Sequence, residues 1–308
     1  MKQKIRKFLS VRTNQILVGI LVLIILGLGF GIYKFITRPM PELPIQEVDL
    51  PFDPEGSYAI LEPRRDGNAA NLIMKRVGGY EQFSYQLVYS SLLSEIENFA
   101  AEGGEGTVDR AAGDLNSFIN LEGKSEYQQE ILFGTCSQGF TSGTAHCVFD
   151  QGVENGTLTL RMQKPVKRGD KVRTVYKMMV TWHLQKPDVA LGKITSVDAH
   201  FMYETKATGS ELSNVAYTLV SDLTAAPKLP SDKSVLGKVY AFNVPTAKTF
   251  PKGDVTIELI DNPPADAKIA RFVEKDNSWQ VLETQADGAK LKASAEGAGI
   301  FTVLIDKK

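Results

Sequence analysis

Histidine, cysteine and tryptophan are scarce in this chain of 308 residues, which has 3 His, 2 Cys and 2 Trp. Metal sites and activated nucleophiles draw mainly on histidine and cysteine. The sequence contains no Cys-x-x-Cys pair, and no nucleophile with a base or pair of carboxylates at a recognisable spacing. We therefore expect no metal, no cofactor and no enzymatic activity. The alternative is a hydrolase of the cell envelope whose groups meet only in the fold.

An excess of charge of one sign is lacking as well. Lysine and arginine number 35 against 36 aspartate and glutamate, which gives a net charge of −1. Five of the cations precede the first long apolar segment: Lys2, Lys4, Arg6, Lys7 and Arg12. The remainder of the chain is therefore mildly acidic, whereas nucleic-acid binding requires a basic surface. We expect no nucleic-acid partner.

One long apolar run lies near the N-terminus. Ile16–Tyr33 contains 18 apolar residues, and continuing to Ile36 gives roughly 30 Å of helix, enough to cross a hydrocarbon core. We predict a transmembrane helix over residues 15–36 that contacts the lipid bilayer. The alternative is a cleaved signal peptide, but its apolar core would be shorter and would be followed by a small-x-small cleavage site.

The residues that flank this run predict its orientation. Basic residues are retained on the cytoplasmic side of a membrane, so residues 1–14 are expected to form a cytoplasmic tail. The result is a single-pass protein of the plasma membrane with an extracytoplasmic body. Residues 37–56 contain five prolines, which favour an extended chain and predict a stiff stalk.

The body begins near Ser57, and its pattern is mainly that of β-strands. Alternating apolar and polar residues, or runs of β-branched and aromatic residues, mark the strands. We predict strands over residues 82–89, 156–163, 172–185 and 194–205. Residues 91–102 differ, because their apolar side chains have helical spacing and Gly103 follows them. We predict one short helix there.

The two cysteines, Cys136 and Cys147, are separated by ten residues that include two glycines. This spacing favours a hairpin closed by a disulfide, and disulfides persist outside the reducing cytosol. Free thiols are one alternative. The other is a metal site that adds His146, although it would have three ligands and no Cys-x-x-Cys partner.

A local group of cations predicts the main candidate binding site. It consists of Lys164, Lys167, Arg168, Lys171 and Arg173. Such a group could contact an anionic polymer such as a wall glycan. The alternative is an ordinary solvated hairpin, in which Arg168-Gly-Asp170 supplies the turn.

The histidines offer one further interpretation. His183 and His200 fall in predicted strands, and they could share a metal or act with Asp198 as base and orienting group. The alternative is that both are surface histidines on opposite strand faces from their aromatic neighbours, and this is the arrangement we expect.

The C-terminal quarter has an ordered set of features. Residues 236–260 and 270–304 contain a Tyr-x-Phe strand followed by Pro and Phe, a Val-Thr-Ile strand, an aromatic strand, a Trp before a Leu, an Asp-Gly turn and a closing Gly-x-Phe strand. The residues are Tyr240, Phe242, Pro245, Phe250, Val255, Thr256, Ile257, Phe272, Trp279, Leu282, Asp287, Gly288, Gly299 and Phe301. This order resembles the β-sandwich module of bacterial and archaeal surface proteins that is related to the sandwich of ankyrins and netrin receptors. The resemblance implies a sandwich fold and says little about activity.

Together these observations predict a mainly β protein. A single transmembrane helix precedes two β-sandwich-like domains, over residues 57–226 and 227–308, with one short helix in the first. We expect a structural or interaction protein of the prokaryotic cell envelope that binds a protein or a glycan. The alternatives are an accessory subunit of a membrane complex, with the anchor as its contact surface, and the envelope hydrolase.

Overall fold

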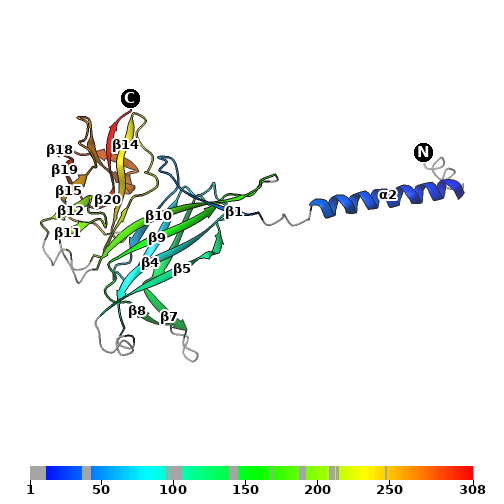
Figure 1. Ribbon diagram of the computed structural model, residues 1–308, viewed down its shortest axis with the longest axis horizontal. Helices are drawn as coiled ribbons and strands as arrows, with labels where there is room; N and C mark the ends of the chain where they lie inside the picture. The colour runs from blue at the N-terminus through cyan, green and yellow to red at the C-terminus, as the bar shows by residue number, and fades with distance from the viewer. Residues whose placement is uncertain are drawn as a thin grey trace. The chain divides into compact units, whose positions relative to one another are not determined.

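The structure is a computed structural model, shown in Figure 1. It describes residues 12–36, 43–94, 97, 106–138, 145–167, 169–186, 192–207, 212, 215–246 and 248–307. The chain divides into two compact units, one that ends at Pro44 and one over Ile45–Lys308. The second unit is built from β-strands, so the prediction of a mainly β protein is confirmed.

Helix α2 (Arg12–Ile36) lies in the first unit and has 25 residues. The side chains described in it are those of residues 19–34, and all of them are exposed. The predicted helix over residues 15–36 is therefore confirmed as a helix. Within the residues described, no helix has the length and apolar character needed to cross a membrane.

The largest sheet has ten strands among the described residues. Its strands are β1 (Ile45–Asp49), β4 (Gln82–Leu92), β5 (Thr107–Asn120), β9 (Asn155–Gln163), β10 (Arg173–Gln185), β13 (Tyr217–Ser221), β14 (Lys233–Asn243), β16 (Lys268–Val273), β17 (Ser278–Val281) and β20 (Gly299–Asp306). Nine of them follow the order β17-β16-β20-β14-β13-β10-β9-β4-β5, and β1 pairs with β10.

Three smaller sheets lie in the described part of the second unit. Their strands are β2 (Tyr58–Pro63), β3 (Ala69–Lys75), β6 (Glu126–Leu132), β7 (Gly134–Gln138), β8 (Ala145–Phe149), β11 (Lys193–Thr195), β12 (Phe201–Thr205), β15 (Gly253–Glu258), β18 (Thr284–Asp287) and β19 (Lys290–Ala295). The sheet orders are β11-β12-β15-β19-β18, β2-β3-β6 and β7-β8. A 3₁₀ turn, η1 (Glu274–Asp276), lies between β16 and β17.

Strand β1 occupies a particular place beside β10. The C-terminal part of β10 pairs with β13, whereas residues 173–177 pair in parallel with β1. Glu47 of β1 forms an ion pair with Arg161 at 2.9 Å, and Asp49 forms one with Lys177 at 3.6 Å. β1 therefore covers the stretch of β10 that β13 leaves open.

Part of the predicted stalk over residues 37–56 is thus a sheet strand and not a free spacer. The prolines explain where the strand lies. Pro44 and Pro51 flank a segment that contains no proline, and this segment keeps the backbone N–H groups that a sheet requires. Leu50 continues the pairing, because its N–H donates to the carbonyl of Lys177 at 2.7 Å.

The described residues of the second unit form two hydrophobic cores. One contains Trp182 and Val220, and the other contains Tyr203 and Leu219. All five residues of β13 are buried, because neighbouring side chains of a strand point to opposite faces of its sheet and each face here packs into a different core. The largest sheet therefore contributes to both cores.

The predicted strands over residues 82–89, 156–163 and 172–185 are confirmed as β4, β9 and β10. The single strand predicted over 194–205 is wrong, because a turn divides it into β11 and β12. Ala199 donates its N–H to the carbonyl of Ser196 at 2.9 Å, and the Asp198 carboxylate accepts from the His200 N–H at 3.2 Å. The short side chain of Asp198 stabilises this turn by accepting from a backbone N–H. The strand pattern over residues 194–205 did not indicate the turn.

The helix predicted over residues 91–102 is not among the elements described. Ser91 and Leu92 belong to β4, and residues 95–96 and 98–105 lie outside the described part of the chain. Ser94 and Glu97 exchange hydrogen bonds of 2.8 and 3.3 Å between side chain and backbone, as in a capping box.

Strands from both sides of the predicted boundary at residues 226 and 227 share two sheets. β12 pairs with β15, and β13 pairs with β14. The sheets therefore cross this boundary without a break, and the two predicted domains remain a prediction.

Candidate functional site

The basic hairpin, defined as residues 164–173, joins β9 to β10. Asp170 donates its N–H to the carbonyl of Lys167 at 3.1 Å, and its carboxylate accepts from the Lys167 N–H at 2.7 Å. Gly169 has φ of +106°, a conformation that side chains other than glycine rarely adopt. The predicted turn is therefore confirmed at Gly169 and Asp170, whereas Arg168 lies outside the described residues.

The hairpin lines a hollow of about 410 Å³. Four of the five predicted cations lie around it, namely Lys164, Lys167, Lys171 and Arg173. The hollow is also lined by Gly79, from the turn that precedes β4, and by Tyr176, from β10. These four predicted cations therefore share one concave surface.

Two tyrosines hold the first of these cations in place. The Lys164 ammonium lies 4.7 Å from the ring centroid of Tyr176 and 5.7 Å from that of Tyr80. The two rings meet edge to face, with centroids 5.9 Å apart. A cation over an aromatic face is attracted by the ring quadrupole. Burial raises the pKa of Tyr80, so its hydroxyl adds no negative charge near neutral pH.

The cations of the basic hairpin lack counter-ions within the part of the chain that the structure describes. Neither Lys164 nor Lys167, Lys171 or Arg173 forms an ion pair with another described residue. The nearby sheet cations Arg161 and Lys177 do pair with Glu47. Asp170 also lines the hollow, but its carboxylate already accepts from backbone. The hollow therefore has an excess of positive charge that attracts anions.

Two residues near this hollow, Tyr80 and Gly79 of the turn before β4, were not predicted from the sequence. Tyr80 and Gly79 precede the hairpin by more than 80 residues, and the pairing of β4 with β9 brings them there. The register places Gln82 opposite Gln163, next to Lys164. No local pattern could have found them, because strand register is set by contacts distant in sequence.

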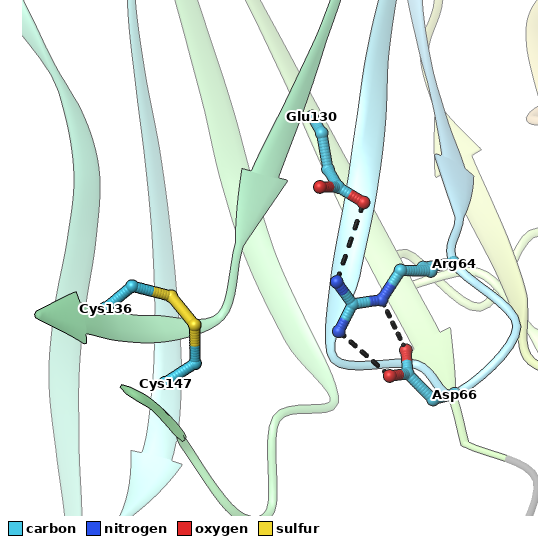
Figure 2. Close-up of a disulfide and its surroundings, with 5 residues drawn as sticks. All are labelled: Arg64, Asp66, Glu130, Cys136 and Cys147. Atoms are coloured by element: carbon cyan, nitrogen blue, oxygen red, sulfur yellow. Dashed lines mark hydrogen bonds and ion pairs between the residues drawn. A yellow bond between two sulfur atoms is a disulfide. The ribbon is translucent and has the colours of Figure 1, made fainter. Parts of the chain in front are cut away.

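The predicted disulfide is confirmed. Cys136 and Cys147 are directly opposite on β7 and β8 and are joined by a bond between their sulfurs (Figure 2). No described cysteine is free, so the free-thiol alternative is wrong. The side chain of His146 lies outside the described part, and the described residues contain no group of three metal-ligating side chains.

The base of this two-stranded ribbon is fixed to the body by polar contacts. The Tyr89 hydroxyl donates to the Asp150 carboxylate at 2.8 Å, and Arg110 pairs with the same carboxylate at 3.1 Å. Burial, followed by the Asp150 carboxylate, raises the pKa of Tyr89. Arg64 lies 5.3 Å from the ring centroid of Phe149 at the end of β8.

Figure 2 shows that Arg64 faces two carboxylates. It forms a bidentate pair with Asp66 at 2.8 Å, and its third nitrogen lies 3.6 Å from Glu130 of β6. This network holds the loop between β2 and β3 beside β6. It is a structural support for the ribbon, since each charged group already has a partner.

The two predicted strand histidines have different partners. His183 of β10 shares a hydrogen bond of 2.7 Å between its Nδ1 and the Asn155 side chain. His200 lies 3.2 Å from the carbonyl of Glu258 through its Nδ1. No contact joins the two among the described residues, and the shared site that was considered is not formed. His183 instead lines a second hollow, of about 400 Å³.

Burial lowers the pKa of His183, although the nearby Glu154 carboxylate acts in the opposite direction. The unfolded chain therefore takes up this proton more readily than the folded protein does. The contribution of His183 to the free energy of unfolding is greatest above about pH 6.5, and it falls as the pH drops below that value. Between about pH 8 and about pH 5.5, we expect the urea midpoint of the His183→Gln variant to fall less than that of the unchanged protein. Both midpoints are measured on the full chain in detergent.

The matched control for this experiment is His200→Gln, which removes a histidine that does not line the hollow. An equal fall of the midpoint in His183→Gln and in the unchanged protein would show that His183 does not titrate as its burial requires.

No protein-family model matches the chain, and no curated protein matches it either.

Proposed function

We propose that the chain is a single-pass, membrane-anchored interaction protein of the prokaryotic cell envelope that binds an anionic polymer through the basic hairpin. Residues 15–36 anchor it in the plasma membrane, with residues 1–14 in the cytoplasm and the β-rich body outside. The observation that carries the proposal is the hollow of the basic hairpin, where four cations meet without a described counter-ion.

The location rests on two independent features. The apolar run over Ile16–Tyr33 follows five cations, which is the pattern of an anchor whose N-terminus stays inside. The Cys136–Cys147 disulfide suits an oxidising compartment outside the cytosol. The arrangement in two β-sandwich-like domains belongs to the same proposal.

A polymer suits the basic hairpin better than a single small anion does. The four cations are spread along ten residues of chain, and three of them are lysines, whose ammonium groups act as separate point charges. An exposed ion pair contributes only about 0.2–1 kcal/mol. Useful affinity therefore requires several contacts at once, which repeated anionic groups on one polymer can supply.

A charge-matched pair of triple variants tests the proposal. Lys164, Lys167 and Lys171 are replaced together by glutamine, and in the control Lys248, Lys268 and Lys275 are replaced. The control lysines form no ion pair with a described residue and lie outside the hollow. Binding of the full chain in detergent to dextran sulfate, an anionic glycan without carboxylates, is measured. The hairpin variant is expected to bind about tenfold more weakly, since three pairs of about 0.5 kcal/mol are lost.

Binding is also expected to weaken as salt is raised, because exposed charges are screened over about 8 Å at physiological ionic strength. The control variant should bind as the unchanged protein does. Equal losses in both triple variants would overturn the proposal, since binding would then follow total charge and not the hairpin.

A further inference from the structure

A second hollow lies at the opposite end of β10 from the basic hairpin. The loop before β9 contributes Val153 and Glu154, the end of β10 contributes His183 and Leu184, and β11 contributes Lys193 and Thr195. Its volume of about 400 Å³ lies within the range of about 300–1,000 Å³ that small-ligand sites occupy. Three segments of the chain thus line a hollow that is separate from that of the hairpin.

His183 lines this hollow, and its neutral ring has one nitrogen that can accept a hydrogen bond. Its Nδ1 lies 2.7 Å from the Oδ1 of Asn155, an acceptor, so Nδ1 carries the proton. Nε2 of the neutral ring is then left with its lone pair. Burial lowers the pKa of this imidazole and keeps the ring neutral near pH 7.

Glu154 and Lys193 add charges of opposite sign. The loop that bears Glu154 is tied to β10, because Leu184 donates its N–H to the Glu154 carbonyl at 2.6 Å. Among the described residues, neither the Glu154 carboxylate nor the Lys193 ammonium forms an ion pair. The neighbouring Lys186 differs, because it donates to the Asn68 side chain at 3.2 Å.

Two apolar residues of the lining belong to the hydrophobic core. Val153 and Leu184 are each 1% exposed and pack within that core, so the polar side chains provide the surface of the hollow. Beside Gln151 and Gln185, the described lining supplies the Glu154 carboxylate, the His183 ring, the Thr195 hydroxyl and two ammonium groups. The ammonium of Lys186 already donates to Asn68 and to the Asp150 carbonyl. This set fits a ligand with several hydroxyl groups and one negative charge.

We propose that this hollow binds one saccharide unit that bears a carboxylate, a hexuronate. Its hydroxyls donate to Glu154 and to Nε2 of His183, and its carboxylate pairs with Lys193. The inference does not rest on the polymer binding proposed for the basic hairpin, because the two hollows share no described residue.

The test uses the full chain in detergent and two probes, the methyl glycosides of glucuronate and of glucose. Saturation-transfer NMR titrations measure their binding. The glucuronide is expected to bind at least fivefold more tightly than the glucoside. Lys193→Gln should remove this difference and leave glucoside binding unchanged, because only the carboxylate contacts the ammonium. His183→Ala should weaken both probes about tenfold, roughly the loss of one hydrogen bond.

Two controls make the result specific. Lys268→Gln removes a lysine of β16 outside the hollow, and the triple hairpin variant removes the other cationic site; neither should change glucuronide binding. No saturation transfer to either probe would overturn the proposal. Equal binding of the two glycosides, or glucuronide binding that survives Lys193→Gln unchanged, would also overturn it. Lys193 is exposed, so this variant tests the site even where His183→Ala fails to fold.

Discussion

Replacing Trp182 by alanine is expected to lower the free energy of unfolding by about 3–5 kcal/mol. Trp182 is fully buried, and its ring stacks on Phe133 with centroids 5.5 Å apart. Gly156 lies against the same ring so closely that a methyl group there would come within 2.6 Å of it. The flanking strands β9 and β13 are held by ladder hydrogen bonds and can fill the space only in part, so a cavity remains.

Urea unfolding of the full chain in detergent, followed by circular dichroism, measures this loss. The matched control is Trp279→Ala at the other tryptophan. Trp279 lies on the terminal strand β17, is partly exposed, and donates its Nε1–H to the Lys228 carbonyl at 3.0 Å. Its replacement should cost clearly less. Equal losses of unfolding free energy in the two variants would show that Trp182 is not at the centre of the core that it shares with Val220.

Joint replacement of Cys136 and Cys147 by serine is expected to lower the free energy of unfolding by about 2–3 kcal/mol. The disulfide closes a loop with a sequence separation of 11 residues, and its removal gives the unfolded chain more conformations. β7 and β8 pair with each other in a sheet of two strands, so no further ladder among the described residues compensates for the loss.

The unchanged protein under reducing conditions is the control for this pair. It should match the double serine variant, whose own stability should not respond to the reductant. A double variant as stable as the oxidised protein would contradict the expected role of the bond.

The strands could be predicted where burial follows a period of two. In β10, Met178, Val180, Trp182 and Leu184 are buried toward one core, and this alternation is readable in the sequence. The pattern failed at β11 and β12, where Asp198 turns the chain. It failed again at β1, whose parallel pairing with β10 depends on Glu47 and Asp49 meeting Arg161 and Lys177.

The candidate sites show the same limit. The cations of the basic hairpin are neighbours in sequence, and they could be predicted as a group. Tyr80 reaches Lys164 only through the register of β4 against β9. The second hollow is assembled from three separate segments, so Glu154, His183 and Lys193 could not be related by any spacing.

Strand β1 also determines how the body responds to a mechanical load. Ile45, at the start of β1, is paired with Arg173 at the start of β10. A force applied between the chain before Ile45 and the basic hairpin would load these parallel strands from the same end. Their hydrogen bonds then break one after another, whereas a pull from the far end of β10 would load them together. Loaded in this way, β1 and β10 would separate gradually at low force and would not rupture at once.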